Sequence, residues 1–243
     1  MKISPVKKLL NLLYPQDIKC IICDCELNTG SHYSICEKCF HSLPRNNGKT
    51  CLKCGEPIKS MAKYCLHCKK STPNFTKSFA PLIYKPPITN LIKDFKYNNK
   101  KYLAKTLGSF LVESYIINNL NCDIILPVPL YLLREKQRGY NQAYLLAMEF
   151  NKQLNLPVNK DILVRTKNTL TQTFLSKQER MKNVKNAFKV TNAQLVKNKV
   201  VLLIDDVYTT GSTLNECSEC LLLAGAKKVY CLTLAHTLPE KAV

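Results

Sequence analysis

Little in this 243-residue chain is typical of a fibrous, disordered or membrane-spanning protein. Only 7 Gly and 12 Pro are present, so collagen-like repeats and long flexible segments are excluded. The unbroken apolar runs, such as residues 200–204 and 221–224, are far shorter than the ~18–20 residues that cross a bilayer. Because 46% of the residues are hydrophobic and 22% are charged, the composition predicts a globular protein with a sizeable core.

The N-terminal segment lacks the pattern of an export signal. Its apolar stretch is broken by Asn11, and no small-residue cleavage site comes before Cys20. Apolar residues instead recur there at helical spacing, which predicts a short amphipathic helix over residues 5–14 that packs against the core. We therefore expect neither a signal peptide nor a membrane contact at this end.

Acidic residues are also scarce. The chain has 17 Asp and Glu against 36 Lys and Arg, a formal net charge of +19. Such a balance favours phosphate-bearing partners, nucleic acid among them. However, 31 of the cations are Lys and 21 residues are Asn, a combination that an AT-rich coding sequence produces by itself. Both explanations of the charge stay open at this point.

Cysteine, by contrast, is abundant, and its spacing indicates metal binding. Eight of the 13 Cys form four C-x-x-C pairs, which are Cys20/Cys23, Cys36/Cys39, Cys51/Cys54 and Cys65/Cys68. Two intervening residues let a tight turn aim both thiolates at one ion, and tetrahedral zinc takes four of them. The sequence therefore predicts two structural zinc ions, and thiolate ligation favours a reducing, cytoplasmic location.

The spacing does not decide which pairs share an ion. We predict consecutive pairing, with the first two pairs in one site and the last two in the other; an interleaved cross-brace is the alternative. Four nearby residues lack a partner at this spacing and are taken as bystanders: Cys25, His32, His41 and His67. A purely structural role of the metals is favoured over direct contact with nucleic acid. Cys217 and Cys220 lie in an apolar helical pattern and are interpreted as small buried side chains.

The composition changes after Cys68, and we place a domain boundary near residue 72. Residues 1–72 would form the small zinc-binding domain, and residues 73–243 a larger one. Helical patterns cover residues 88–95, 103–111 and 142–154, and residues 123–127 form a short apolar run. This alternation predicts an α/β fold with a mostly parallel sheet flanked by helices.

Residues 200–235 are the most informative segment. The apolar run 200–204 predicts a central parallel strand that stops at Asp205 and Asp206. The loop VYTTGST follows, then a helix over about 214–223 and a strand over 228–234. A strand, a loop rich in Thr, Ser and Gly, and a helix N-terminus together favour an anion site, because N–H groups, hydroxyls and the helix dipole all attract negative charge.

This loop has neither the Walker A pattern nor a G-x-G-x-x-G turn. The paired carboxylates would repel a phosphate, but they can accept hydrogen bonds from sugar hydroxyls, directly or through Mg²⁺. A 5-phosphorylated ribose satisfies both requirements.

Residues 201–213, VLLIDDVYTTGST, resemble the phosphoribosyl pyrophosphate (PRPP) motif of type I phosphoribosyltransferases. Together with the cysteine pairs, the segments PVPL (127–130) and RGYNQ (138–142), and four more distant residues, the whole chain is similar to the ComF family, specifically its ComFC-type competence proteins. The four residues are Gln172, Arg180, Asn183 and Phe188.

The resemblance implies a type I phosphoribosyltransferase-like fold and a role for each matched segment. Asp205 and Asp206 would bind the ribose hydroxyls. The 5′-phosphate loop would comprise Val207, Tyr208, Thr209, Thr210, Gly211, Ser212 and Thr213. The pyrophosphate loop would lie within residues 128–139, with Val128, Pro129, Arg138 and Gly139 as its candidates.

The distribution of arginine supports this placement independently. Only five Arg occur, and four of them lie between residues 134 and 180. Where Lys is the default cation, a retained Arg suggests a need for a planar bidentate donor, as for phosphate. Arg134, Arg165, Arg180 and Gln172 are therefore further site candidates, with ordinary surface Arg as the alternative.

The resemblance implies displacement of pyrophosphate at the anomeric carbon of Mg²⁺-bound PRPP, with the protein supplying position and electrostatics. No residue is named as general base, and a structural role is favoured for His236. Three functions remain: an active phosphoribosyltransferase of unknown acceptor, a DNA-uptake factor whose PRPP site regulates it, and a nucleotide-salvage enzyme, which is the weakest.

The family resemblance also implies a role in natural transformation, beside a competence helicase and a DNA-processing protein. Contact with single-stranded DNA has weak support in the sequence. Aromatic residues alternate with lysines between residues 93 and 102, namely Phe95, Tyr97 and Tyr102 among Lys93, Lys96, Lys100 and Lys101.

Overall fold

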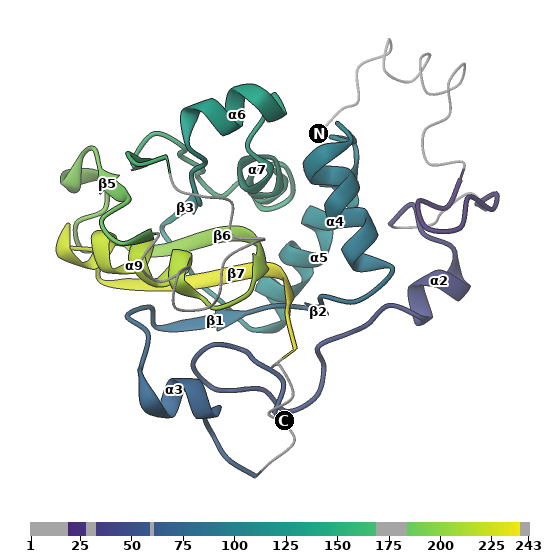
Figure 1. Ribbon diagram of the computed structural model, residues 1–243, viewed down its shortest axis with the longest axis horizontal. Helices are drawn as coiled ribbons and strands as arrows, with labels where there is room; N and C mark the ends of the chain where they lie inside the picture. Colours follow the sequence, from purple (N-terminus) through teal and green to yellow (C-terminus); the bar gives the residue numbers. More distant parts are fainter. Residues whose placement is uncertain (1–18, 28–32, 59–60, 169–183, 239–243) are drawn as a thin grey trace. The chain divides into compact units, whose positions relative to one another are not determined.

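The computed structural model describes residues 19–27, 33–58, 61–168 and 184–238 (Figure 1). The predicted helix over residues 5–14 lies outside them. By its internal contacts the chain divides into two compact units, residues 1–43 and 44–243, which are described separately. No helix among the described residues has the length and apolar character needed to cross a membrane.

The first unit is small. Its described part contains an antiparallel bridge between Lys19 and Glu26 and one short helix, α2 (Glu37–His41). The first two cysteine pairs lie at these two places, with Cys36 directly before α2 and Cys39 inside it. So few apolar side chains cannot form a core of the usual size, and a metal centre is a common remedy in such small folds.

The second unit is built on a parallel sheet. The strands are β1 (Lys77–Phe79), β2 (Leu82–Ile83), β3 (Ile124–Pro127), β6 (Val200–Tyr208) and β7 (Lys228–His236). Their order is β1-β7-β6-β3, with β2 beside the far end of β7, and every pair is parallel. β3 and the first five residues of β6 are continuous apolar runs because parallel strands in such a sheet are buried on both faces.

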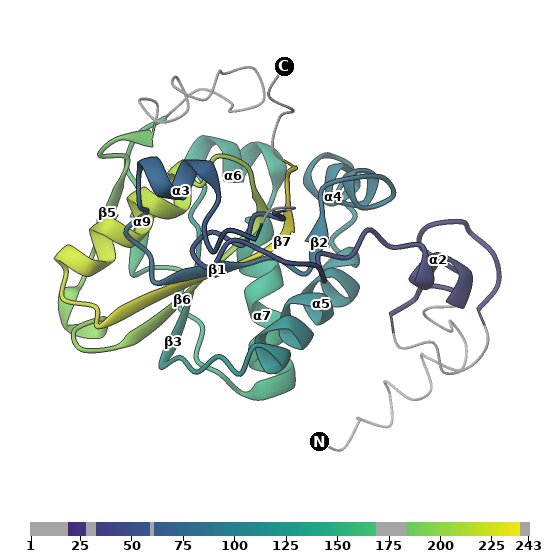
Figure 2. The same ribbon diagram turned by 90° about the horizontal axis from the view of Figure 1, so that it is seen from below.

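Helices cover the sheet (Figures 1 and 2). On one face lie α5 (Leu103–Ile117) and α7 (Gln142–Leu154), and beside α5 lies α4 (Ile88–Tyr97). The other face packs against α9 (Ser212–Leu223) and the antiparallel pair β4 (Leu163–Arg165) and β5 (Phe188–Val190). The remaining short helices are α3 (Leu66–Lys70), α6 (Leu132–Arg138) and a 3₁₀ turn, η2 (Ala193–Leu195).

The predicted α/β class and parallel sheet are confirmed, but one strand end was predicted wrongly. β6 does not stop at the two acids; it continues through them to Tyr208, paired in register with His236 of β7. Hydrophobicity ends at Ile204, whereas backbone pairing does not, so an apolar run marks the buried part of a strand and not its end.

The third and fourth cysteine pairs pack inside the second unit. Cys51, Cys54, Cys65 and Cys68 belong to the same hydrophobic cluster as Val201, Leu203 and Val229 of the sheet. This division by packing places them with residues 44–243, whereas the boundary near residue 72 was inferred from composition and stays a prediction.

Candidate functional site

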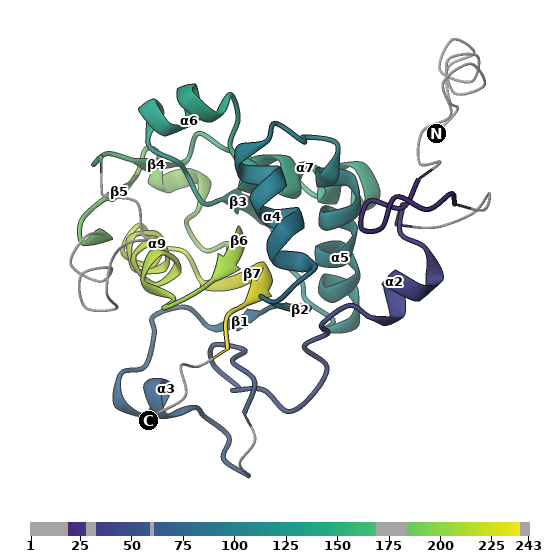
Figure 3. The same cartoon turned by 45° about the vertical axis from the view of Figure 1, so that its right-hand side comes forward.

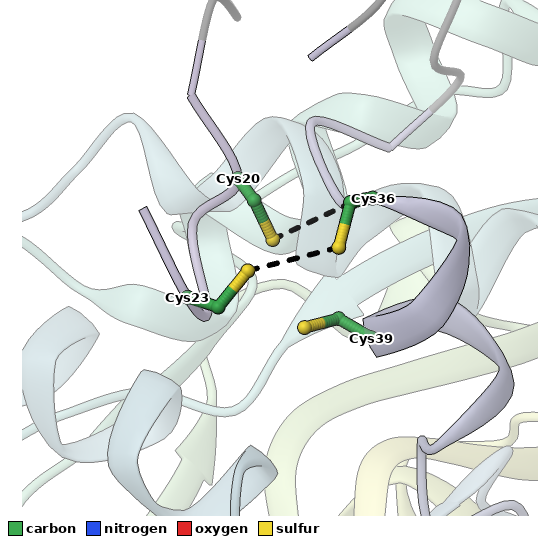
Figure 4. Close-up of side chains that lie close together, drawn as sticks. All are labelled: Cys20, Cys23, Cys36 and Cys39. Carbon is green, nitrogen blue, oxygen red and sulfur yellow. Dashed lines mark hydrogen bonds between the residues drawn. The ribbon is translucent and has the colours of Figure 1, made fainter. Parts of the chain in front are cut away.

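The first cysteine cluster joins the first two pairs (Figure 4). The sulfurs of Cys20, Cys23, Cys36 and Cys39 all lie within 4.8 Å of one another. Cys23 Sγ is 3.7 Å from Cys36 Sγ, and the Cys36 N–H donates to Cys20 Sγ at 3.4 Å. Four converging thiols with backbone N–H donors to sulfur are the donor set that tetrahedral zinc requires.

The second cluster joins the last two pairs in the same way. Its four sulfurs also lie within 4.8 Å of one another, and all four residues are buried. Gly55 follows Cys54 with a φ of +75°, and a Cβ there would stand 2.8 Å from the Ser78 carbonyl oxygen. The tight turn therefore requires glycine at this position. Consecutive pairing is confirmed in both clusters, and the interleaved alternative is excluded.

The predicted bystanders stay outside both clusters where the structure describes them. Cys25 is not one of the four converging sulfurs, although its thiol interacts with Cys23 and Cys36, which raises its pKa to about 12. His41 lies 3.8 Å from Glu37 on α2. His67 is part of α3 and lines a cavity of about 280 Å³ beside the loop after β6. His32 lies outside the described residues.

The two acids at the end of β6 differ in their surroundings. Asp206 is 4% exposed, and its Oδ1 lies 2.7 Å from Lys96 Nζ, whereas its buried Oδ2 has no hydrogen-bond partner among the described residues. Asp205 Oδ1 accepts from the Asp206 N–H at 2.8 Å. Burial, and next the charge of Asp206, raise the pKa of Asp205 to about 7, although Lys96 and Arg165 act in the opposite direction.

The predicted phosphate segment, residues 207–213, comprises the last two residues of β6, a turn over residues 209–211 and the first two residues of α9, and the chain turns sharply at Gly211. Its φ is +75°, and a Cβ there would stand 2.1 Å from Tyr208 Oη, so only glycine fits. Thr210 Oγ1 and Ser212 Oγ are 2.8 Å apart. Helix α9 begins at Ser212, whose N–H donates to Thr210 Oγ1 at 3.4 Å, and its N-cap residue Gly211 has no side chain to cap it. The positive end of the helix dipole favours an anion there.

Tyr208 anchors this loop to the sheet. Its ring stacks on His236 at 4.4 Å and meets Phe75 edge-on at 6.4 Å. His236 is 1% exposed, and its Nδ1 lies 2.6 Å from the Thr237 carbonyl oxygen. Burial lowers the pKa of His236 to about 4. These contacts agree with the structural role expected for His236.

The predicted pyrophosphate segment follows β3 at the same edge of the sheet. Since β3 and β6 are parallel, Val128 and Pro129 leave the sheet where Asp205 and Asp206 lie. The segment contains helix α6, which ends at Gly139 with a φ of +80°. Arg138 hydrogen-bonds to Gln142 Oε1, and its guanidinium stacks over the Tyr97 ring at 5.3 Å.

Three arginines influence one another electrostatically, and the last of them is also influenced by Asp205. Burial, and next the charge of Arg138, lower the pKa of Arg134. Burial, and next the charge of Arg134, lower the pKa of Arg165, while Cys217 and Asp205 act in the opposite direction. Several arginines whose charges affect one another, close to only one carboxylate, favour the binding of a polyanion such as pyrophosphate. Gln172 and Arg180 lie outside the described residues.

Two sequence interpretations need correction. Phe95 is 0% exposed and belongs to the core, so it offers no face for base stacking. Lys96 was grouped with surface lysines, but it is bound to Asp206. Both residues lie on α4, whose apolar side chains face inward at helical spacing, and this periodicity was the signal available for Phe95.

Three residues that hold the site, one of them Lys96, were not predicted as parts of it. Asn141 caps α7 by accepting from the Ala143 N–H at 2.9 Å, and its amide donates to the Val128 carbonyl at 3.1 Å. The Tyr140 hydroxyl donates to the Phe95 carbonyl. Lys96 is the third. Asn before a helical run is a capping signal, whereas nothing local marks Tyr140 or Lys96.

Comparison with known proteins matches both halves of the chain. Residues 9–69 match the double zinc ribbon domain, and residues 140–242 the phosphoribosyl transferase domain. The chain is 35% identical to competence protein F of Haemophilus influenzae, over 90% of this chain and 97% of that protein. It is 31% identical to the DNA utilization protein YhgH of Escherichia coli K12, over 90% and 97%, and 26% identical to competence protein ComFC of Bacillus subtilis, over 90% and 95%.

Proposed function

This chain belongs to the ComF family of competence proteins, and we propose that it binds the magnesium complex of PRPP at the edge of its sheet and acts in DNA uptake with direct contact to single-stranded DNA. One observation carries the PRPP part: the acids Asp205 and Asp206, the turn at Gly211 before α9, and the arginine-bearing segment after β3 lie at one edge of the sheet, because β3 and β6 are parallel.

Each part of this edge suits one part of PRPP. The loop 209–213 and the start of α9 would receive the 5′-phosphate, because N–H groups and hydroxyls gather there. Asp205 and Asp206 would accept from the ribose hydroxyls. Arg134, Arg138 and Arg165 would face the pyrophosphate, whose charge Mg²⁺ neutralises when bound.

This arrangement suits transfer chemistry that needs no nucleophile from the protein. The bond between C1′ and the pyrophosphate oxygen would break while an acceptor bonds to C1′, with both ends of PRPP held in place. The acceptor stays open, and a role of the PRPP site in regulation is the alternative. Salvage of a free base remains the weakest option, because the relatives named above are competence and DNA utilization proteins.

The test is calorimetric titration of Mg²⁺-PRPP into the zinc-loaded protein. Replacing both acids (Asp205→Asn with Asp206→Asn) should weaken binding roughly a hundred-fold or more, since two hydrogen bonds to charged groups are lost. Asp161→Asn is the matched control, because this carboxylate is exposed and lies away from the acid pair, before β4. Equal affinity of the double variant and the wild type would refute the assignment.

A second surface, which shares Arg138 with the proposed PRPP site, supports contact with single-stranded DNA. Tyr97 and Tyr102 are 63% and 64% exposed, and Lys100 and Lys101 lie between them in sequence. The Arg138 guanidinium already stacks on Tyr97, which is the geometry that bases also adopt on aromatic rings. We call these five residues the tyrosine surface (Figure 3 shows α4, at whose end it lies).

Fluorescence anisotropy with a labelled oligonucleotide tests this surface. Replacing both tyrosines (Tyr97→Ala with Tyr102→Ala) should reduce affinity by at least about ten-fold, because stacking contributes ~1–3 kcal/mol per base. Tyr64→Ala is the control, since Tyr64 is also exposed (45%) but lies elsewhere. Equal losses in both variants would argue against a specific surface. A competence helicase and a DNA-processing protein remain the predicted partners.

A further inference from the structure

Lys96 occupies an unusual place for a lysine. It lies in the last turn of α4, and its side chain is only 21% exposed. Its ammonium group is 2.7 Å from Asp206 Oδ1, on a carboxylate side chain that is 5% exposed. A strongly hydrated ammonium loses water in such a place, so the ion pair must compensate for that loss.

The ion pair leaves the two oxygens of Asp206 unequal. Oδ1 accepts from Lys96, whereas the buried Oδ2 has no hydrogen-bond partner among the described residues. A buried carboxylate oxygen without a donor is costly and uncommon in folded proteins. A ribose hydroxyl is a donor of the size and chemistry that would satisfy it.

The backbone beside the lysine is held by the residue that follows the predicted pyrophosphate segment. The Tyr140 hydroxyl donates to the carbonyl of Phe95, the residue before Lys96, and Phe95 is fully buried. Tyr140 directly follows Gly139, the last residue of that segment. One hydrogen bond therefore links the end of the pyrophosphate segment to the backbone beside Lys96.

We propose that Lys96 is a positioning residue of the ribose site, which holds Asp206 through Oδ1 as a resident counter-cation and leaves Oδ2 as the atom offered to a ribose hydroxyl. This role rests on the proposed PRPP function. It also implies a specific division of charge: the lysine compensates the acid pair, so Mg²⁺ is needed only on the pyrophosphate of PRPP.

The first test replaces the ammonium group. Lys96→Gln should weaken binding of PRPP roughly ten- to a hundred-fold. Raising Mg²⁺ beyond the concentration that saturates PRPP should recover part of this loss, because the metal then compensates the acid pair in place of the ammonium group, while wild-type affinity stays flat. Lys96→Arg keeps the charge and should restore the flat dependence on Mg²⁺.

Lys93→Gln is the matched control, because it removes the same charge from an exposed position on the same helix. It should bind PRPP as the wild type does. A Lys96→Gln variant with wild-type affinity and a flat Mg²⁺ dependence would overturn the proposal.

A double-mutant cycle separates loss of the ion pair from a folding defect of the Lys96→Gln variant, because the double variant lacks both partners of the pair. In an Asp206→Asn background, Lys96→Gln should cause little additional loss of PRPP affinity if the lysine acts through Asp206. Additive losses would contradict that mechanism. If the wild type itself does not bind PRPP, the proposed function fails, and that result is distinct from either outcome above.

Discussion

The two cysteine clusters have the same ligands and the same pair spacing, yet they lie in different surroundings. In the first cluster Cys20 and Cys39 are buried, Cys36 is partly exposed and Cys23 is exposed. In the second, all four residues are buried among the side chains of the sheet, α9 and Phe75. One cluster stabilises a small unit; the other is part of the core of a large one.

This difference teaches that one motif can serve two structural purposes in one chain. Phe75 lies at 0% exposure in the second cluster's hydrophobic group and meets Tyr208 edge-on. Tyr208 in turn contacts Gly211 of the phosphate loop. The second metal centre is therefore joined to the proposed PRPP site by packed side chains, whereas the first belongs to a separate unit.

The largest effect is expected from removing one ligand of each cluster. Cys54→Ser should lose one zinc, unfold much of the second unit and abolish PRPP binding, because structural zinc contributes on the order of 10 kcal/mol in small metal-dependent folds. Cys23→Ser should also lose one zinc, but should leave PRPP affinity and the main thermal transition unchanged. Zinc content, melting curves and PRPP titration check both variants. Equal damage from Cys23→Ser would contradict the comparison.

Zinc release should also separate the clusters. With a chelating dye, the first site should release its metal at least about ten-fold faster than the second. An exposed thiolate such as Cys23 is accessible to competing ligands, whereas a buried thiolate becomes accessible only when the structure opens locally. Two phases of equal amplitude are expected in the wild type. The fast phase should vanish in Cys23→Ser, and a single phase in the wild type would mean that burial does not govern release.

The metal clusters and the loop were largely predictable because their chemistry is local. Each C-x-x-C pair places its two thiols within one turn, and the DDVYTTGST run places its acids, hydroxyls and glycine within nine consecutive residues, so short-range geometry largely determines them. Consecutive pairing of the cysteine pairs was a prediction that the spacing alone left open. The sulfur positions confirm it.

Lys96 shows what the sequence could not reveal. Its partner Asp206 is distant in the chain, and the contact exists only because α4 packs beside the carboxyl end of β6. Nothing in the neighbouring sequence distinguishes the largely buried Lys96 from the many other lysines of the chain. The end of β6 was predicted wrongly for a related reason, since pairing with β7 carries the strand beyond its apolar residues.

Two glycines with positive φ, Gly211 and Gly139, compare a crowded backbone position with an open one. Gly211→Ala should cost about 3 kcal/mol or more and weaken PRPP binding, since it combines a positive φ with a clash on Tyr208 Oη. Gly139→Ala has the same backbone strain, but no atom lies within 4 Å of its Cβ, so a loss of ~1–2 kcal/mol is expected. Denaturant unfolding measures both. Similar losses would show that Tyr208 does not restrain the loop.

The smallest effect concerns two histidines, one in each unit. Burial lowers the pKa of His236 from 6.5 to about 4, so the folded state binds fewer protons than the unfolded state between these values. The stability that His236 contributes is therefore complete above pH 6.5 and is lost as the pH falls toward 4. Between about pH 7.5 and pH 5.5 the loss should be about 1 kcal/mol.

Unfolding measured at both pH values, at matched zinc content, checks this. His236→Gln should remove this pH-dependent component, because the buried ring that must stay neutral is gone. His41→Gln is the control in the first unit, where the side chain is 74% exposed, and it should leave unfolding of the second unit unchanged. Asp205, whose pKa burial raises to about 7, changes the stability with the opposite sign in both proteins, so the difference between the wild type and His236→Gln isolates the histidine. An equal dependence on pH in the two proteins would contradict the assignment to His236.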